Sequence, residues 1–324
     1  MRNEFDILKS FAILLVVLGH VTTMYRQSSF FDGIPVNTTL AAITFVIYIF
    51  HMPLFIALSG AVYEYGIGRG KYGDFKLFIV NKVKRIIVPC VFVGVCVLSP
   101  TLYLIKDTSI TSCLYDIYVL GGVNSRHLWY LGAIFWCYLW GWFITKSKVN
   151  LLLMFLISVF LEMIFVKIFV FNYLYIKHGV CALKSFVFGM ALVRYKVKNN
   201  TIALLGGMSC LILLILGINI IESTKNAKIC ELLLPYSIVF MLFIVARLLK
   251  NSLIDNYFLA FILRNVFPIY LFHVECIYLM YNYWGKSVPA IIMIPFAVFS
   301  SISVSVFLAY LIRKLKLQCL IGEK

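Results

Sequence analysis

The sequence predicts an all-α protein: a polytopic bundle of about ten transmembrane helices with both termini in the cytoplasm. Of its 324 residues, 63% are hydrophobic and only 13% are charged, and the mean hydropathy is +0.98. Charged residues make up roughly a quarter of a typical soluble domain, so this chain lies outside that class. We therefore expect an integral membrane protein that contacts the lipid bilayer along most of its length.

The apolar residues are grouped in runs separated by short polar connections. A helix of roughly 20 residues crosses the hydrocarbon core, and runs of about this length are predicted as spans. The predicted spans are 6–25, 40–63, 86–105, 127–145, 150–171, 179–194, 201–221, 232–249, 259–281 and 288–312. No connection is long enough to hold a soluble domain. We expect a single transmembrane domain over residues 1–324, with no appended soluble domain.

The basic residues set the predicted orientation. The formal net charge of +16 comes from 29 Lys and Arg residues, but these are dispersed over the connections rather than gathered in one patch. No nucleic-acid partner is therefore expected. Of the 29, twenty lie in the even-numbered connections and at the two ends, seven lie in the odd-numbered connections, and Lys167 and Lys184 lie within spans. Because cytoplasmic loops are enriched in Lys and Arg, both termini are predicted to be cytoplasmic.

Three ionisable residues share one face of the first predicted span. At about 100° per residue, the steps from Lys9 and from Asp6 to His20 return to within roughly 20° and 40° of their starting directions. An ionisable group in a lipid-embedded helix costs on the order of 3 kcal/mol, so such groups normally face a protein interior or a wet cavity. This stripe predicts a functional site.

Five short motifs occur in order along the chain and together carry a resemblance to a known family. They are Asp6-Ile-Leu-Lys9 with Val17-Leu18-Gly19-His20, Phe50-His51-Met52-Pro53-Leu54-Phe55 with Leu58-Ser59-Gly60, Lys82-Val-Lys84-Arg85-Ile-Ile-Val-Pro89, His127-Leu128-Trp129-Tyr130-Leu131, and Pro268-Ile-Tyr270-Leu-Phe-His273. This set resembles the acyltransferase-3 family of integral membrane acyltransferases, of the type that O-acetylates bacterial surface polysaccharides. The resemblance implies a ten-helix fold, and it implies an essential catalytic part for His20.

The chain departs from the family pattern at two positions. Lys9 and Lys82 stand where the family usually has Arg, the second in an Arg-x-x-Arg pair that ends here in Arg85. Lys keeps the positive charge but lacks the planar fork that grips a phosphate or carboxylate with two bonds. The detailed contacts to an acyl donor are therefore expected to differ from those of the Arg-containing members.

Acyl transfer from a thioester to a hydroxyl needs a base, a grip on the polyanionic donor and stabilisation of the oxyanion. His20 is the predicted base, roughly 20 Å along the helix from the cytoplasmic end. Whether it acts as a general base or forms an acyl intermediate is left open. Asp6 is predicted either to orient the catalytic site or to act structurally, as a helix cap or as the i, i+3 partner of Lys9.

Donor binding is predicted for Lys9, Lys82 and Arg85. Coenzyme A carries several phosphate charges, and Lys82 and Arg85 are three residues apart on the predicted cytoplasmic side. The acyl donor is expected to be acetyl-CoA, used as a co-substrate. The alternative for such a basic connection is a topology signal with lipid headgroup contacts.

Four residues are candidates for the substrate side of the site: His51, Arg126, His127 and Trp129. His51 is expected to shape the pocket, and His127 with Trp129 to contact a sugar or anchor the outer interface. Arg126 is expected to hold an anionic or hydroxylated acceptor. His273 and Glu275 face apart on one helix, so at most one is expected in the site.

The predicted function is a membrane O-acyltransferase of the bacterial cytoplasmic (inner) membrane that acetylates a surface or lipid-linked glycan, such as O-antigen, capsule or exopolysaccharide. A secondary transporter or glycan flippase is the alternative, although no repeat relates the two halves of the chain. A polysaccharide polymerase ranks below both. The nine cysteines form no closely spaced pair, and no metal site is expected. A homo-oligomer is compatible with the sequence, which does not determine it.

Overall fold

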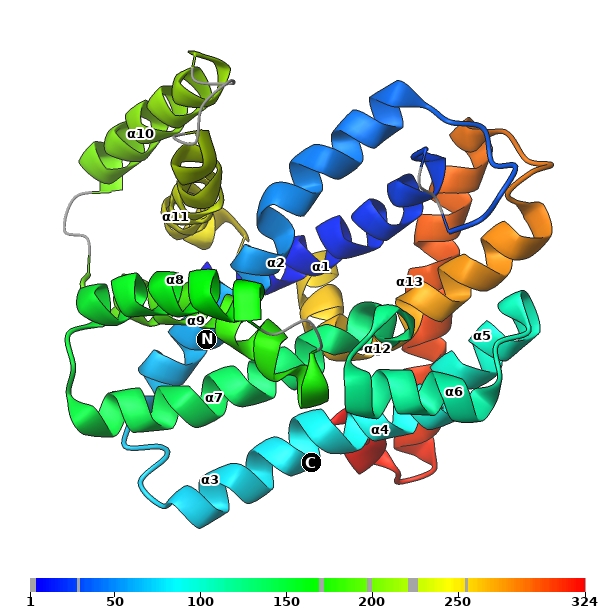
Figure 1. Cartoon of the computed structure of the whole chain (residues 1–324), viewed down its shortest axis with the longest axis horizontal. Helices are drawn as coiled ribbons and strands as arrows, with labels where there is room; N and C mark the ends of the chain where they lie inside the picture. Colours follow the sequence, from blue (N-terminus) through cyan, green and yellow to red (C-terminus); the bar gives the residue numbers. More distant parts are fainter. Residues whose placement is uncertain are drawn as a thin grey trace.

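The computed structural model describes residues 4–27, 30–168, 172–196, 200–220, 227–253 and 256–323. Within these residues every regular element is helical, and the helices form one bundle (Figure 1). Nine helices in the described part of the chain are long and apolar enough to cross a membrane. The prediction of an all-α, polytopic transmembrane bundle is confirmed.

The elements follow one another with short connections. In order they are α1 (Glu4–Thr22), η1 (Thr23–Tyr25), α2 (Thr38–Ile67), α3 (Phe75–Lys82), η2 (Val83–Ile87), α4 (Val88–Val93), η3 (Gly94–Leu98), α5 (Ser99–Lys106), α6 (Ile110–Tyr115), η4 (Asp116–Leu120), η5 (Val123–Leu128), α7 (Trp129–Ser147), α8 (Leu151–Ile168), η6 (Tyr173–Tyr175), α9 (Ile176–Arg194), α10 (Asn200–Ile220), α11 (Ala227–Leu253), α12 (Tyr257–Trp284), α13 (Ala290–Lys314) and η7 (Gln318–Ile321). Of the short elements, η2, η3 and η4 are π-helical and η1, η5, η6 and η7 are 3₁₀-helical.

Nine of the ten predicted spans coincide with observed membrane-length helices, including the sixth, which runs over 173–194 and is longer than predicted. The predicted seventh span corresponds to α10, but its qualifying apolar stretch covers only Ile202–Leu213, and residue 221 lies outside the described residues. The tenth crossing therefore stays a prediction.

The third span begins at Phe75, well before the predicted start at residue 86. It is a continuous helical segment of 32 residues, Phe75–Lys106, which is longer than the roughly 20 that the hydrocarbon core requires. Its first turns carry several cations, so the sequence pattern assigns them to a polar connection rather than to the span. This explains the later predicted start. Two π-helical turns interrupt it, and such turns are frequent at functional sites.

Side-chain caps fix where several long helices begin. Asn37 accepts a hydrogen bond from the Leu40 amide at 3.0 Å at the start of α2, and Asn256 does the same for Leu259 at the start of α12. Asp74 accepts from the Lys76 amide at 2.8 Å and begins the third span. Such caps satisfy amides that have no partner within the helix.

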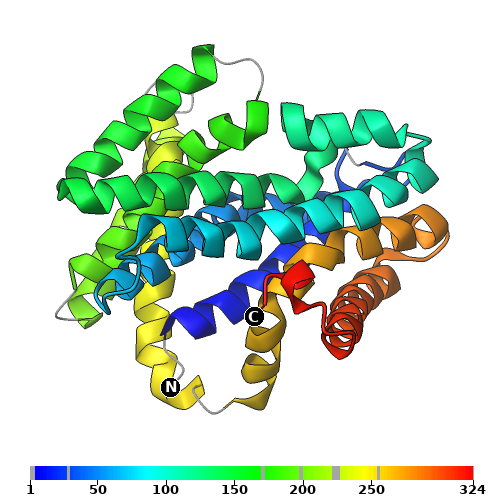
Figure 2. The ribbon, with the colours of Figure 1, turned by 90° about the horizontal axis from the view of Figure 1, so that it is seen from below.

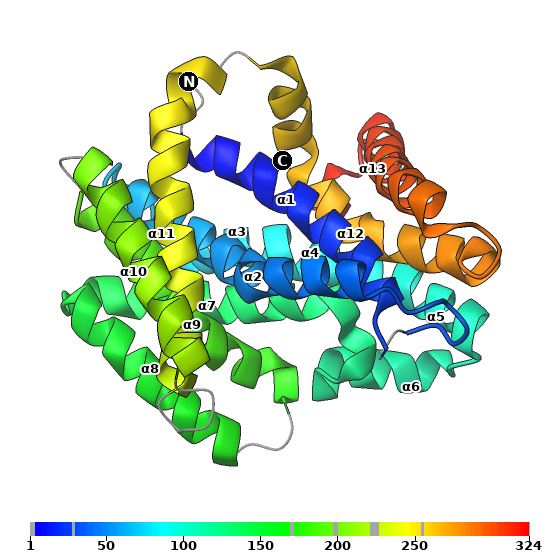
Figure 3. The same cartoon turned by 90° about the horizontal axis from the view of Figure 1, so that it is seen from above.

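The helix α1 lies at the centre of the bundle, between α2 and α12 (Figure 3). On its other side α2 packs closely against α9 because glycines remove the side chains between them. A Cβ added at Gly60 would lie 2.0 Å from the Phe186 carbonyl oxygen, and one at Gly189 would lie 1.8 Å from the Ala57 carbonyl oxygen. Only glycine fits at these two positions.

The connection between the third and fourth spans contains a short helix that sequence periodicity did not predict. Residues Ile110–Leu120 form α6 and its continuation η4, and α6 packs beside α5 (Figure 1). The side chains of Cys113 and Ile117 bury one side of this helix. At the opposite end of the chain, the turn η7 packs against α12, α4 and η2 (Figure 2).

Candidate active site

Three histidines from distant parts of the chain meet inside the bundle and are called here the histidine cluster: His20 of α1, His127 of η5 and His273 of α12. The His273 ring centroid lies 5.1 Å from that of His20 and 5.5 Å from that of His127. His127 and His273 are buried, whereas His20 keeps part of its surface exposed. The geometry of the cluster is set by the contact of α1 with α12 and by the turn η5, which carries His127.

Hydrogen bonding fixes which nitrogen of His273 carries the proton. Its Nδ1 lies 2.9 Å from the Ile269 carbonyl oxygen and 2.8 Å from the Tyr270 carbonyl oxygen. Carbonyl oxygens only accept, so Nδ1 is the donor and Nε2 of the neutral ring carries the lone pair. Nε2 is buried and has no hydrogen-bond partner among the described residues. The ring therefore presents an unengaged proton acceptor inside the cluster.

His127 is held in the same manner through the opposite nitrogen. Its Nε2 donates to the Leu271 carbonyl oxygen at 3.2 Å, which leaves Nδ1 as a buried acceptor without a partner among the described residues. Glu275 Oε1 lies 3.9 Å from the same Nε2, too far for a hydrogen bond but close enough for an ion pair if the ring is protonated. Both carboxylate oxygens of Glu275 likewise lack a described hydrogen-bond donor.

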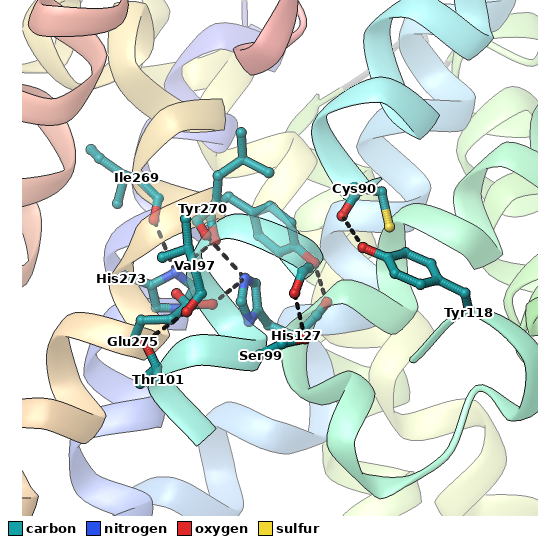
Figure 4. Close-up of polar contacts among 12 residues, drawn as sticks. Cys90, Val97, Ser99, Thr101, Tyr118, His127, Ile269, Tyr270, His273 and Glu275 are labelled. Carbon is teal, nitrogen blue, oxygen red and sulfur yellow. Dashed lines mark hydrogen bonds and ion pairs between the residues drawn. The ribbon is translucent and has the colours of Figure 1, made fainter. Parts of the chain in front are cut away.

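Figure 4 shows His127, His273 and Glu275 gathered beside the third span. The neighbouring hydroxyls of Ser99 and Thr101 are occupied, since they donate to carbonyl oxygens of their own helical segment at 2.6 Å and 2.7 Å. An unpaired buried polar group costs about 1–3 kcal/mol, and one in a native structure calls for an explanation such as a bound substrate or water. The unpaired atoms therefore make the cluster a candidate site for a polar reactant.

A cavity with basic residues at its entrance, called here the cationic cavity, lies beside the cluster and shares Tyr270 with its surroundings. It has a volume of about 380 Å³, within the range of small-molecule sites. Lys9, Lys82 and Arg85 all line it, together with residues near the C-terminus such as Glu323. The first helix, the third span and the C-terminal segment therefore meet at one mouth. The three predicted donor-binding residues lie together.

Aromatic and hydroxyl side chains connect the cationic cavity to the histidine cluster. Ser59, Tyr130 and Tyr270 line its wall, and the hydroxyls of Ser59 and Tyr130 lie 3.1 Å apart. The Tyr270 ring stands 5.5 Å from that of His127, and its hydroxyl donates to the His127 backbone oxygen. Tyr270 thus belongs to the cavity wall and to the surroundings of the cluster at once.

The three cations of the cavity are held differently. Lys9 lies 3.5 Å from Asp6, and the Lys82 ammonium sits 3.2 Å from the Tyr138 ring centroid and 5.5 Å from those of Tyr72 and Phe78. Burial raises the pKa of Tyr72, an effect that the charge of Arg85 partly offsets, so its hydroxyl stays neutral near pH 7. Arg85 itself is exposed, and no described carboxylate pairs with it.

Comparison with known families identifies the chain. The model of the acyltransferase-3 family, described as "Acyltransferase domain", matches residues 2–310. The chain belongs to this family. Neither the search of curated proteins nor that of solved structures found a match. The protein is thus a multi-pass membrane acyltransferase, and the resemblance carried by the five motifs is confirmed.

In this acyltransferase the stripe on the first span faces the site as a whole. Lys9 lines the cationic cavity, Asp6 pairs with Lys9, and His20 joins the histidine cluster farther along the same helix. His51 lies behind the cluster: its Nδ1 donates to the Ile47 carbonyl oxygen at 3.0 Å, and the Tyr48 ring contacts both His51 and His20. This position agrees with a role in shaping the pocket.

The structure places Trp129 apart from His127, although both are expected on the substrate side of the site. Its ring lies 5.0 Å from that of His178 and lines a second cavity of about 320 Å³ between α2, α9 and α11. His127 points instead into the histidine cluster. The two side chains diverge because the chain passes from the 3₁₀ turn η5 into α7 between them. Among the described residues, no ring contact or hydrogen bond joins Trp129 to the histidine cluster.

His273 and Glu275 were expected to exclude one another, and this expectation is wrong. Both side chains lie beside His127. The reason is that His127 packs against α12 at Tyr270 and Leu271, where it contacts His273 on one side and Glu275 on the other. The motif that ends in His273 already indicated this residue. Helix geometry alone, however, could not show where His127 packs against α12. Within the described residues, no group of three side chains lies in an arrangement that could hold a metal ion.

Proposed function

We propose that this acyltransferase moves an acetyl group from cytoplasmic acetyl-CoA to a hydroxyl of a bacterial surface or lipid-linked glycan, in the cytoplasmic (inner) membrane. The observation that carries the proposal is that Tyr270 lines the cationic cavity and also contacts His127 of the histidine cluster. Phosphate groups need cations at an exposed entrance, and a thioester must come close to a base. The cavity offers the cations, and Tyr270 places its inner wall beside the histidines.

The donor would bind with its phosphates at Arg85 and Lys9 and its pantetheine arm in the cavity. Arg85 is exposed and can form bidentate bonds to a phosphate, whereas Lys82 contributes its charge from within the aromatic rings around it. The thioester would then lie toward Ser59 and Tyr130. The nucleotide stays on the cytoplasmic side throughout, so only the acetyl group passes toward the outer face.

His20 would take the proton of the acceptor hydroxyl as the hydroxyl oxygen attacks the thioester carbon. The C–S bond then breaks, and the thiolate of coenzyme A leaves with the proton returned by the His20 imidazolium. His273, whose Nε2 is an unengaged acceptor beside His20, would stabilise that imidazolium. General base catalysis of this kind contributes about 10²- to 10⁴-fold.

The test is transfer of labelled acetyl from acetyl-CoA to isolated glycan by the purified protein. We expect His20→Ala to lower the rate by about a hundredfold or more. His178→Ala is the matched control, since His178 is a membrane histidine outside the cluster. Full activity of the His20→Ala protein would rule out the proposed chemistry. Comparing the acetyl content of surface glycan from strains with and without the gene identifies the acceptor.

A further inference from the structure

A second group of cations lies on the other side of the histidine cluster, and none of its members takes part in donor binding. The aromatic–cation cluster consists of Phe30, Lys106, Arg126 and Tyr278. The rings of Phe30 and Tyr278 stack with centroids 4.6 Å apart and planes 14° from parallel. The Arg126 guanidinium carbon lies 4.2 Å, and the Lys106 ammonium 4.7 Å, from the Phe30 centroid. Two positive charges therefore share one ring.

The helix α12 shows where this cluster lies. Phe267 and Tyr270 line the cationic cavity, His273 belongs to the histidine cluster, and Tyr278 stacks on Phe30 farther along the helix. At 1.5 Å per residue, Phe267 and Tyr278 are about 16 Å apart along the axis. The order on α1 is the same, with Lys9 before His20. The aromatic–cation cluster thus borders the site on the side opposite the donor cavity, which is the side predicted to face outward.

Within the described part of the chain, the cations of this cluster have no acidic partner. No described carboxylate forms an ion pair with Lys106 or Arg126, and Arg126 Nε is buried without a described hydrogen-bond partner. Aromatic faces offset a cation by only about 0.5–2 kcal/mol. Two like charges on one ring also repel each other, so the arrangement favours an anion between or beside them. Lys106 is exposed and Phe30 is partly exposed, so such an anion has access.

The backbone holds Arg126 in an unusual conformation that serves this placement. Its φ of 45° and ψ of −123° lie outside the regions that residues with a Cβ normally adopt. Such strain costs of order 1–3 kcal/mol and persists where the surroundings require it. Here it turns Arg126 onto Phe30 while the next residue, His127, enters the histidine cluster. Arg126, which would bind the acceptor, and His127 of the histidine cluster would thus be coupled through the peptide unit that joins them.

We propose that the aromatic–cation cluster binds an anionic group of the acceptor, either a carboxylate on its sugars or a phosphate of its lipid carrier, so that the acceptor is an anionic rather than an uncharged glycan. This inference rests on the proposed function and names its substrate class. Arg126 would bind the anion with two parallel hydrogen bonds, and Lys106 would add a mobile second charge. The hydroxyl to be acetylated would then lie toward His127 and His20.

The test measures binding without any acyl donor, by the thermal denaturation midpoint of the purified full-length protein in detergent. The probes are a glucuronate-containing tetrasaccharide, the same tetrasaccharide with its carboxylates reduced to alcohols, and a neutral glycan on polyprenyl diphosphate. We expect one of the anionic probes to raise the midpoint in a saturable manner and the reduced tetrasaccharide to have no effect. Arg126→Gln and Lys106→Gln should each weaken that binding about tenfold or more, as loss of a charge-assisted hydrogen bond does.

Lys177→Gln is the matched control, because Lys177 is a cation of the same predicted face, at the start of α9, and is not a member of the cluster. Stabilisation by the glucuronate probe would support a carboxylate-bearing acceptor, and stabilisation by the diphosphate probe would support recognition of the lipid-linked phosphate. Equal binding of charged and reduced saccharides, unchanged in Lys106→Gln, would overturn the inference. Because Lys106 is exposed, that variant is expected to fold even if Arg126→Gln does not.

Failure of this inference is distinguishable from failure of the proposed function. If acetyl transfer to a neutral glycan proceeds while no anionic probe binds, the acidic acceptor is wrong and the acetyltransferase stands. If anionic probes bind through Arg126 and Lys106 but no acyl transfer occurs with any acceptor, the anion site is supported and the proposed activity is wrong.

Discussion

The two cationic regions of the molecule differ in how their charges are compensated. Around the cationic cavity the protein compensates part of the charge: Asp6 pairs with Lys9 at 3.5 Å, and the lining residue Glu323 pairs with Arg313 at 2.6 Å, whereas Lys82 and Arg85 have no described acid. In the aromatic–cation cluster neither Lys106 nor Arg126 has a described acid at all. The comparison suggests that recognition depends on the cations that the protein leaves uncompensated.

The largest expected effect follows from removing the exposed uncompensated cation of the donor side, Arg85. Arg85→Ala should raise the KM for acetyl-CoA about 10- to 100-fold, since it removes charge-assisted hydrogen bonds to phosphate. Binding of the anionic saccharide probe should not change. Lys84→Ala is the control, because Lys84 is an exposed neighbour that does not line the cavity. An equal rise of KM in both variants would mean that only the general basic charge of the segment matters.

A second prediction compares how two arginines contribute to the free energy of unfolding: Arg194, which pairs with an acid outside both cationic regions, and Arg126 of the aromatic–cation cluster. Arg194 binds Glu64 through two hydrogen bonds of 2.7 Å and 3.0 Å, so Glu64→Gln should lower the unfolding free energy by about 1–3 kcal/mol. Arg126→Gly removes a cation without an acid partner and relieves a positive φ, so it should raise the unfolding free energy by up to about 1 kcal/mol.

Thermal unfolding in detergent measures both changes. For Arg126→Gly the same protein should lose its affinity for the anionic probe, and this combination of a more stable fold and weaker binding is what a purely structural arginine would not produce. Destabilisation by Arg126→Gly comparable to that by Glu64→Gln would show that Arg126 supports the fold.

The smallest effect is expected at Asp6. Its ion pair with Lys9 is partly exposed, and such pairs contribute about 0–1 kcal/mol. Asp6→Asn should therefore change acetyl transfer by no more than about threefold, acting through the position of Lys9. Initial rates at saturating donor and acceptor measure this. A loss of two orders of magnitude would instead assign Asp6 a direct part in the reaction.

Sequence periodicity predicted which residues share a face of one helix, but it did not predict which residues of different helices contact one another. The shared face of Lys9 and His20 follows from helix geometry, and both residues reach the site. The pairing of Lys184 with Glu162 joins α9 to α8, and neither helix on its own indicates it. In lipid such a pair satisfies two charges that would otherwise be costly, which explains how the sixth span tolerates its lysine.

The site illustrates the same limit. Trp129 is expected beside His127 because both stand at the predicted outer start of the fourth span, yet the turn from η5 into α7 directs Trp129 to a second cavity and His127 to the histidine cluster. Glu275 was discounted because helical geometry opposes it to His273, yet the arrival of His127 brings both into one cluster. The π-helical turns of the third span also have no sequence signature that periodicity detects.

The glycine contacts between α2 and α9 bear on how two substrates could meet across a bilayer. A carrier that exposes its site to each side in turn needs parts that rock against one another. At Gly60 and Gly189 the two backbones touch with no room for a methyl group, so sliding along this seam would require the helices to part. Both reactants would instead enter the protein from opposite leaflets without movement of α2 against α9. The protein would then join the two sides of the membrane without exposing its site to each side in turn.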